Sequence, residues 1–134
     1  MIVLDASVIL KWVLPDETDS PAALAYLDQH IEGTNSIAVP ELLFYEIANA
    51  LATKTALLSA DIIERFTLVV GAELESYHLN IDTFSEAVKM SKRFKISLYD
   101  SSYIALAEFL GCDMITADRR LRSSVKALRN VKSL

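Results

Sequence analysis

Four acidic side chains could carry out chemistry together, because each lies at the end or the border of an apolar segment. Asp5 and Asp118 each follow a short apolar run, Asp100 lies three residues after Ser97, and Glu46 lies in a helical pattern. Carboxylates that converge repel one another and raise each other's pKa, so they are tolerated mainly around a divalent cation. Ligands that are all oxygen favour hard ions such as Mg²⁺ or Mn²⁺ over zinc. The four acids are therefore candidate metal ligands.

Each of these acids also has an ordinary structural explanation. An aspartate in front of a helix is a preferred N-cap, which would account for Asp5 and Asp118. Ser97 and Asp100 fit a Ser-x-x-Asp capping box. Glu46 lies at the border of an apolar helix face formed by Leu43, Ile47, Ala50 and Leu51. Both explanations stay open for each acid alone, but three acids at strand ends or in first helical turns together favour a site.

Short apolar segments alternate with segments of helical periodicity along the chain. The pattern predicts strands at residues 1–4, 36–39, 77–81, 113–116 and 131–134. It predicts helices that begin at Ser20 and Ser59, and further helices at residues 40–54, 83–94, 97–110 and 118–128. A capping box of Thr83 and Glu86 marks the start of one helix, and Gly111 marks the end of another.

Strands that alternate with helices, without hairpin signals, favour a parallel sheet covered by helices on both faces. The 134 residues contain no repeat or linker, so residues 1–134 are expected to form a single α/β domain. In such sheets ligands bind beyond the carboxyl ends of the strands, where the strand order changes direction. Asp5 and Asp118 both follow predicted strands and therefore lie at that edge.

The composition excludes several classes of protein. Hydrophobic residues make up 52% of the chain, and Gly and Pro contribute only three residues each, which excludes disordered and collagen-like chains. The one cysteine, Cys112, cannot form a disulfide within the chain, and two histidines are too few for a Cys/His metal site. Because the apolar runs are short, we expect a cytoplasmic protein that does not enter a membrane.

The net charge of −5 conceals an uneven distribution. Residues 1–88 hold 14 of the 18 acidic residues but only 3 of the 13 basic ones, and residues 89–134 hold the remainder. Two solvated helix faces would explain the basic residues, and so would a patch that faces an anion. An overall acidic charge argues against a general nucleic-acid coat, whereas the basic part of the chain permits a local contact.

The four acids lie within four short blocks of sequence. These blocks are IVLDASV at residues 2–8, PELLFYEIANAL at 40–51, LYDSSYIALA at 98–107 and ITADRRL at 115–121. In this order and spacing they resemble the PIN domain family, and within it the VapC-type toxins. The resemblance covers the whole chain and implies a single PIN domain at residues 1–134. The implied fold is a three-layer α/β/α sandwich whose central, mostly parallel sheet has about five short strands.

The resemblance implies a metal-dependent endoribonuclease that is the toxin of a VapBC-type toxin–antitoxin pair. The family's catalytic and metal-binding acids correspond to Asp5, Glu46, Asp100 and Asp118, which would hold one or two Mg²⁺ or Mn²⁺ ions. Its supporting polar residues correspond to Ser7, Thr116 and Asn49. The implied products carry a 5′-phosphate and a 3′-hydroxyl.

Three arginines follow the last of the acids and indicate how RNA would be held. Arg119, Arg120 and Arg122 are expected to contact phosphates at the rim of the site. The resemblance also implies a small VapB-like antitoxin as a partner, and a homodimer. Candidate partner-facing residues, for which core packing is an equal explanation, are Leu10, Trp12, Val13 and Leu14.

Other functions stay open on the sequence. A PIN-like module could hold RNA or a partner without cutting, although four intact acids weigh against this, and a DNA-directed nuclease could use the same acids. A phosphoryl-transfer domain with Asp5 as nucleophile is disfavoured, because the chain lacks the second aspartate of a D-x-D motif and no strand-end lysine follows Asp118.

Overall fold

A five-stranded sheet runs through the centre of the molecule, and the computed structural model describes residues 1–14 and 18–134 around it. The strands are β1 (Ile2–Leu4), β2 (Ile37–Pro40), β3 (Glu75–Tyr77), β4 (Met114–Thr116) and β5 (Val131–Ser133). The helices are α1 (Ala6–Val13), α2 (Ser20–Ile31), α3 (Leu42–Lys54), α4 (Ser59–Gly71), α5 (Ile81–Phe94), α6 (Leu98–Leu110) and α7 (Arg119–Ser124).

The strand order places a change of direction next to the first strand. The order is β3-β2-β1-β4-β5, and all four neighbouring pairs are parallel. Val3 pairs with Ala38 on one side and with Met114 on the other. The chain therefore builds the sheet outwards from β1 to β3, crosses back, and adds β4 and β5 on the opposite side of β1. This is the parallel sheet that the sequence predicts, and β1 and β4 flank the switch point.

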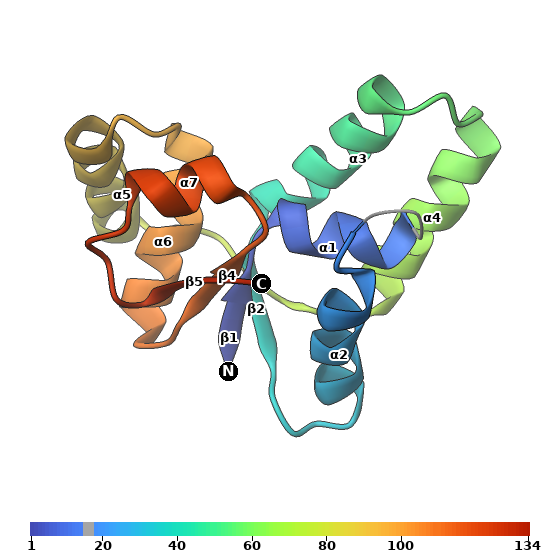
Figure 1. Cartoon of the computed structure of the whole chain (residues 1–134), viewed down its shortest axis with the longest axis horizontal. Coiled ribbons are helices and arrows are strands. Elements are labelled where there is room, and N and C mark those ends of the chain that lie inside the picture. Colours follow the sequence, from blue (N-terminus) through green and yellow to red (C-terminus); the bar gives the residue numbers. More distant parts are fainter. Residues whose placement is uncertain (15–17) are drawn as a thin grey trace.

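Helices cover the sheet on both faces and complete three layers. Figure 1 shows α1 to α4 on one side of the strands and α5 to α7 on the other. Connections before and after the switch point leave the sheet on opposite faces, because crossovers between parallel strands keep one hand. The expected α/β/α sandwich is confirmed, with all described strand pairs parallel.

The strands are continuous apolar runs because helices cover both faces of the sheet. All four residues of β2 and all three of β4 are buried, as parallel strands covered on both faces require. Residues 101–107 of α6 are buried without interruption, so this helix lies inside the molecule. Full burial of one Leu or Ile side chain contributes roughly 1.5–3 kcal/mol of transfer free energy, which makes these short elements stable.

Some predicted boundaries were wrong around the third strand. We expected a strand at residues 77–81 and a helix that starts at Thr83, but β3 ends at Tyr77 and α5 begins at Ile81. The N-cap is Asn80, whose side chain accepts a hydrogen bond from the Thr83 backbone N–H at 2.9 Å. The capping box of Thr83 with Glu86 therefore does not form, because Asn80 already satisfies the first turn.

Other boundaries of helices and strands also differ from expectation. Pro40 ends β2 and does not open a helix, and α7 stops at Ser124 instead of residue 128. Ser20 and Ser59 are the first residues of their helices rather than N-caps. Gly111 ends α6 as predicted, with a φ of 66° that favours glycine.

The four candidate partner-facing residues all contact the core, which was the other explanation for them. Val13 is buried, and the half-buried side chains of Leu10, Trp12 and Leu14 contact the core. Trp12 also donates its indole N–H to the Ala23 carbonyl of α2 at 2.9 Å. Core packing thus explains Val13, and the exposed parts of Leu10, Trp12 and Leu14 stay candidates for a partner contact. Within the described ranges, no helix has the length and apolar character that crossing a membrane needs.

The corrected N-cap of α5 gives a stability prediction. Asn80→Ala removes the acceptor for the Thr83 N–H and should lower the free energy of unfolding by about 1–2 kcal/mol, the usual worth of an N-cap. Glu86→Gln should change it by less than about 0.5 kcal/mol, because Glu86 makes only an exposed ion pair with Lys89. Urea denaturation measures both, and a larger loss in Glu86→Gln would contradict the assigned cap.

Candidate active site

The four predicted acids lie around one cavity at the carboxyl edge of the sheet. The cavity has a volume of about 240 Å³, and Asp5, Glu46, Asp100 and Asp118 all line it. They come from the end of β1, from α3, from the first turn of α6 and from the end of β4. Residues as far apart in sequence as 5 and 118 meet because β1 and β4 are neighbours at the switch point.

Asp5 is the most enclosed of the four acids, with 6% of its surface exposed. Its Oδ1 accepts hydrogen bonds from the Ser7 hydroxyl at 2.5 Å, the Ser7 N–H at 3.0 Å and the Val8 N–H at 3.2 Å. Asp5 is thus the N-cap of α1 and a wall of the cavity at the same time. The N-cap explanation is therefore confirmed for Asp5, and its place on the cavity wall is compatible with the role of metal ligand that the sequence predicts.

Ser7 joins the ends of β1 and β4. Its hydroxyl donates to Asp5 and accepts from the Ala117 backbone N–H at 2.8 Å. The Ser7 hydroxyl oxygen lies 3.4 Å from that of Thr116, which in turn accepts from the Asp118 N–H at 3.0 Å. Thr116 is 1% exposed, so this chain of hydroxyls fixes the floor of the cavity from inside.

Asp118 and Asp100 lie at the starts of two further helices. The Oδ1 of Asp118 caps α7 by accepting from the Arg120 and Leu121 N–H groups at 2.7 and 3.0 Å. Ser97 caps α6 as predicted, because its hydroxyl accepts from the Asp100 N–H at 2.9 Å, but Asp100 accepts at 2.7 Å from that hydroxyl and not from the Ser97 backbone N–H that a full capping box uses. Three helix N-termini, with their partial positive charge, thus surround the acids.

Glu46 is held by a tyrosine that sequence analysis did not single out. The Tyr103 hydroxyl of α6 donates to Glu46 Oε2 at 2.6 Å, and Tyr103 is 1% exposed. Glu46 itself is half-buried on α3. A short hydrogen bond to a carboxylate is among the stronger kinds in proteins, so it fixes Glu46 towards the cavity from the opposite face of the sheet.

Burial, rather than mutual repulsion, is the main reason that two of these acids hold protons tightly. The pKa of Asp5 is raised to about 6, chiefly by desolvation, against hydrogen bonds from Ser7, Thr116 and Val8 that lower it. The pKa of Glu46 is raised to about 7, first by desolvation and then by the charges of Asp100 and Asp5. The Tyr103 hydrogen bond lowers the Glu46 pKa but does not offset burial.

The donor set fits a hard divalent cation. In all four carboxylates the hydrogen bonds whose distances are given above go to one oxygen, so the second oxygen of each is a candidate metal ligand. Across residues 1–14 and 18–134, no three Asp, Glu, His or Cys side chains are yet gathered closely enough to form a metal-binding group. Small side-chain movements about the anchored oxygens are therefore part of any metal site here.

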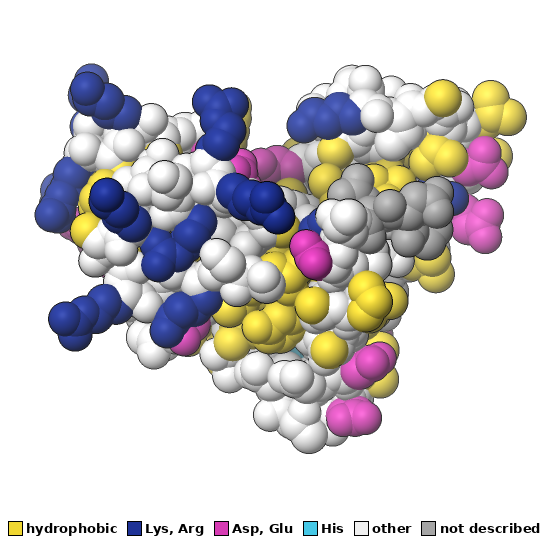
Figure 2. All heavy atoms as spheres, viewed as in Figure 1, with side chains coloured by type: hydrophobic (Ala, Val, Ile, Leu, Met, Phe, Trp, Pro, Cys, Tyr) yellow, Lys and Arg dark blue, Asp and Glu magenta, His cyan; other side chains and the backbone are white. Residues whose placement is uncertain are grey.

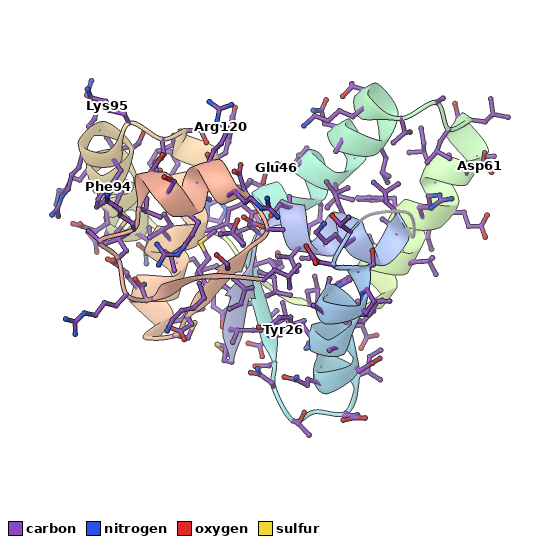
Figure 3. All side chains as sticks on the ribbon, in the orientation of Figure 1. Tyr26, Glu46, Asp61, Phe94, Lys95 and Arg120 are labelled. Carbon is purple, nitrogen blue, oxygen red and sulfur yellow. The ribbon has the colours of Figure 1, made fainter. Side chains whose placement is uncertain are left out.

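The remaining predicted residues differ in how they relate to the cavity. Ser7 and Asn49 line it, whereas Thr116 supports it from below. Arg119 and Arg120 are exposed in the first turn of α7 beside Asp118, outside the lining. Figure 3 shows Arg120 on the α7 side and Glu46 on the α3 side. Arg122 is half-buried, with one guanidinium nitrogen enclosed, so the structure does not bring it to the cavity.

Two polar side chains of the lining were missed, Tyr103 and Lys54. Both lie on helices that the sequence did predict, at positions that share a face with predicted acids. Tyr103 comes three residues after Asp100, and Lys54 comes eight residues after Glu46. Helical spacing could have identified them as neighbours of the site. The sequence offers no signal that Tyr103 reaches Glu46, because that contact crosses the fold.

The model of the PIN domain family matches residues 2–126 of the chain. The chain belongs to the PIN domain family. This match includes all four acids and every lining residue of the cavity. The carboxyl-edge cavity is therefore a feature within the PIN domain, not of a segment added to it.

Individual relatives agree with this assignment. The PIN domain is 27% identical over 134 residues to ribonuclease VapC3 of Pyrobaculum aerophilum, covering 95% of this chain and 96% of the relative. It is 32% identical over 130 residues to ribonuclease VapC9 of Mycobacterium tuberculosis, covering 95% and 93%.

Solved structures show the same fold at lower sequence identity. PAE2754 of Pyrobaculum aerophilum superposes with a TM-score of 0.70 at 21% identity, over 98% of this chain and 87% of the other. VapBC2 of Rickettsia felis, solved with a DNA fragment from its promoter, gives 0.66 at 14% identity over 100% and 99%. The PIN fold is therefore shared by both.

The raised pKa of Asp5 predicts how stability depends on pH in metal-free protein. Between pH 4 and pH 6 the folded state keeps a proton on Asp5 that the unfolded state releases, so stability falls as the pH rises. A shift from 3.8 to about 6 corresponds to a penalty of about 3 kcal/mol above pH 7. Asp5→Asn cannot ionise, keeps a cap acceptor, and should be more stable than wild type by up to that amount at pH 8.

The measurement is urea denaturation of both proteins in chelator at pH 4 and pH 8. The advantage of Asp5→Asn should be less than about 1 kcal/mol at pH 4, where the folded state keeps Asp5 protonated and the unfolded state has released the proton only in part. Asp113→Asn is the control, because Asp113 precedes β4 at the other edge of the sheet and is exposed. If the difference in free energy of unfolding between Asp5→Asn and wild type does not grow with pH, ionisation of Asp5 carries no stability penalty and the prediction is wrong.

Removal of the tyrosine hydroxyl should destabilise the ionised form of Glu46. Tyr103→Phe removes the 2.6 Å hydrogen bond, so the Glu46 pKa should rise further above 7. The loss in free energy of unfolding should be about 1.5–3 kcal/mol at pH 8 and smaller at pH 5, where Glu46 is protonated. Tyr99→Phe, which alters an exposed tyrosine on the same helix, is the control, and equal losses at both pH values would contradict the assignment.

Proposed function

We propose that this PIN domain is a metal-dependent endoribonuclease that hydrolyses RNA phosphodiester bonds as the toxin of a VapBC-type pair. The observation that carries the proposal is the convergence of Asp5, Glu46, Asp100 and Asp118 on one cavity at the switch point. Relatives at 27% and 32% identity over nearly the whole chain bear the name ribonuclease VapC. A non-cutting PIN-like module would have no need to keep four carboxylates together when three of them, Asp5, Glu46 and Asp100, are buried or half-buried at a cost in free energy.

The four acids would hold one or two Mg²⁺ or Mn²⁺ ions. When bound, such an ion lowers the pKa of a coordinated water and screens the charge on the scissile phosphate. Asp5, Asp100 and Asp118 would supply oxygens from three helix starts, and Glu46 would supply one from α3 directly or through water. The raised pKa values of Asp5 and Glu46 mean that cation binding releases protons, so binding should strengthen from pH 6 to pH 8.

The surrounding residues would orient the acids. Ser7 and the Val8 N–H fix Asp5 at Oδ1, Thr116 supports Ser7 and the Asp118 backbone, and Asn49 lies on the cavity wall. Outer hydrogen bonds of this kind are worth about 10- to 100-fold in metal affinity or activity.

Histidine takes no part in this site. Among the described residues that line the cavity there is none. His30 bonds to the backbone of Ala72 and Ile37, and His78 contacts Glu41. The four acids and the cation that they would bind must therefore activate the attacking water, a task that histidine performs in other hydrolases.

The charge distribution supports a nucleic-acid substrate. Figure 2 shows Lys and Arg gathered over α5, α6 and α7, and Asp and Glu over the other side of the molecule. Arg119 and Arg120 would hold phosphates beside Asp118, and a small open site favours single strands or loops. Arg122 is the weakest of the three predicted contacts, since it is partly enclosed.

The biological setting belongs to the same proposal. As a VapC-type toxin, the protein would act in the cytoplasm, form a homodimer and bind a small VapB-like antitoxin. Support comes from the VapBC2 structure of Rickettsia felis, whose toxin–antitoxin assembly contains a chain of this fold. A DNA-directed nuclease is the competing function, because the acids themselves do not distinguish RNA from DNA.

Cleavage of circular single-stranded RNA tests the proposal. Wild type with Mg²⁺ or Mn²⁺ should linearise the circle, since an endonuclease needs no end, and should leave a 5′-phosphate. Asp5→Asn should reduce the rate by more than about 100-fold, because losing a metal ligand exceeds the effect of losing an outer hydrogen bond. Asp113→Asn should cut at the wild-type rate, since Asp113 lies at the far edge of the sheet.

Chelator and DNA separate the alternatives. Excess EDTA should abolish cutting, and a DNA circle of the same sequence should stay intact. Full activity in EDTA or in Asp5→Asn would refute the metal mechanism. Cutting of DNA but not RNA would favour the competing function, and binding without cutting would identify a silent module.

A further inference from the structure

Lys54 stands apart from the other cations in the acidic part of the chain. Residues 1–88 contain only three basic residues, Lys11, Lys54 and Arg65. Lys11 donates to the Thr18 carbonyl and Arg65 donates to the Val13 carbonyl, so both hold the backbone in place. Lys54 makes no hydrogen bond or ion pair with any residue that the structure describes.

The position of Lys54 makes it part of the site. It is exposed at the C-terminal end of α3 and is the one cation among the described residues that line the acid cavity. Its charge lowers the pKa of Glu46, although the two side chains form no direct ion pair. An ammonium group held beside acids but unpaired with them is available to an anion that enters the cavity.

The arginines of α7 lie across the cavity from Lys54. Arg119 and Arg120 follow Asp118 on the opposite helical layer, and both are exposed. Figure 2 shows the surface hollowed between the two helix groups, with acidic side chains at its floor and Lys or Arg on both sides. A strand with one phosphate over the acids would carry its neighbouring phosphates towards these two sides.

We propose that Lys54 binds the RNA phosphate on one side of the scissile bond, while Arg119 and Arg120 bind phosphates on the other side. The inference rests on the proposed function and adds a direction, since the strand would cross the cavity from α7 to α3. Lysine suits this position because its ammonium is a mobile point charge on a long stem, which can follow a phosphate without fixed geometry.

The first test measures RNA binding without cleavage. In an Asp5→Asn background with Mg²⁺, fluorescence anisotropy gives the affinity for a labelled single-stranded RNA of about 12 nucleotides at several salt concentrations. Adding Lys54→Ala should weaken binding about 3- to 10-fold. It should also reduce the slope of log K against log salt by about 0.7, the value of one contact on a single strand. Lys54→Arg should preserve both.

Lys92→Ala is the matched control. Lys92 is also an exposed lysine in the last turn of a helix, α5, but it does not line the cavity. The two variants have the same net charge and lose the same favourable contact with a helix C-terminus. Lys92→Ala should weaken binding less than about 2-fold, because Lys92 is one charge of the broad basic face over α5 to α7 and does not line the cavity, so it acts through a screened field.

The second test locates the phosphate. In an RNA that wild type cleaves, each phosphate near the cut is replaced in turn by a neutral methylphosphonate. The replacement opposite Lys54 should raise KM for wild type and have no further effect on KM in Lys54→Ala. The same scan in Arg120→Ala should find its phosphate on the other side of the cut.

The outcomes separate this inference from the proposed function. Equal binding losses in Lys54→Ala and Lys92→Ala, or phosphates for Lys54 and Arg120 on the same side of the cut, would overturn the inference. If wild type cuts no RNA, the proposed function fails, and the anisotropy and salt slope still decide whether Lys54 contacts a phosphate.

Discussion

A nearly buried carboxylate at the point where the sheet changes direction is the constraint on which the site depends. Asp5 ends β1, and its Oδ1 takes three hydrogen bonds from Ser7 and Val8. The Ser7 hydroxyl also accepts from Ala117 after β4, and so ties together two strand ends that are 110 residues apart in sequence. These donors offset only part of the cost of burial, so the Asp5 pKa stays raised and a cation would stabilise the site.

The acids contribute to folding and to the site at once, which explains how four carboxylates can be kept together. Asp5 and Asp118 cap α1 and α7, and Asp100 accepts from the hydroxyl of Ser97, the N-cap of α6. Each therefore stabilises a helix start with one oxygen while it adds negative charge to the cavity. Glu46 has no such local role and depends on Tyr103. Local hydrogen bonds at helix starts thus stabilise three of the acids, and one long-range hydrogen bond stabilises the fourth.

Most of the fold could be predicted because its signals are local. The apolar runs of β1, β2 and β4, the buried face of α3 and the Ser97 cap depend on neighbours a few residues away, and all were found at or near the predicted positions. The errors fell where two local signals competed. Asn80 and Thr83 are both good N-caps, and the choice of Asn80 moved the start of α5 and shortened the third strand. The strand order β3-β2-β1-β4-β5 could not be predicted from any single segment, because it depends on contacts between distant segments.

The sequence by itself determined the fold class, the four acids and the division of charge, because residue type, periodicity and capping pattern are properties of short stretches. Only the tertiary structure decided that Tyr103 holds Glu46 and that Lys54 is the cation inside the cavity. Those contacts exist because α3 and α6 lie on opposite faces of the sheet and meet at its carboxyl edge. Burial of Asp5 is likewise a tertiary outcome, since desolvation depends on everything packed around the residue and not on its neighbours in sequence.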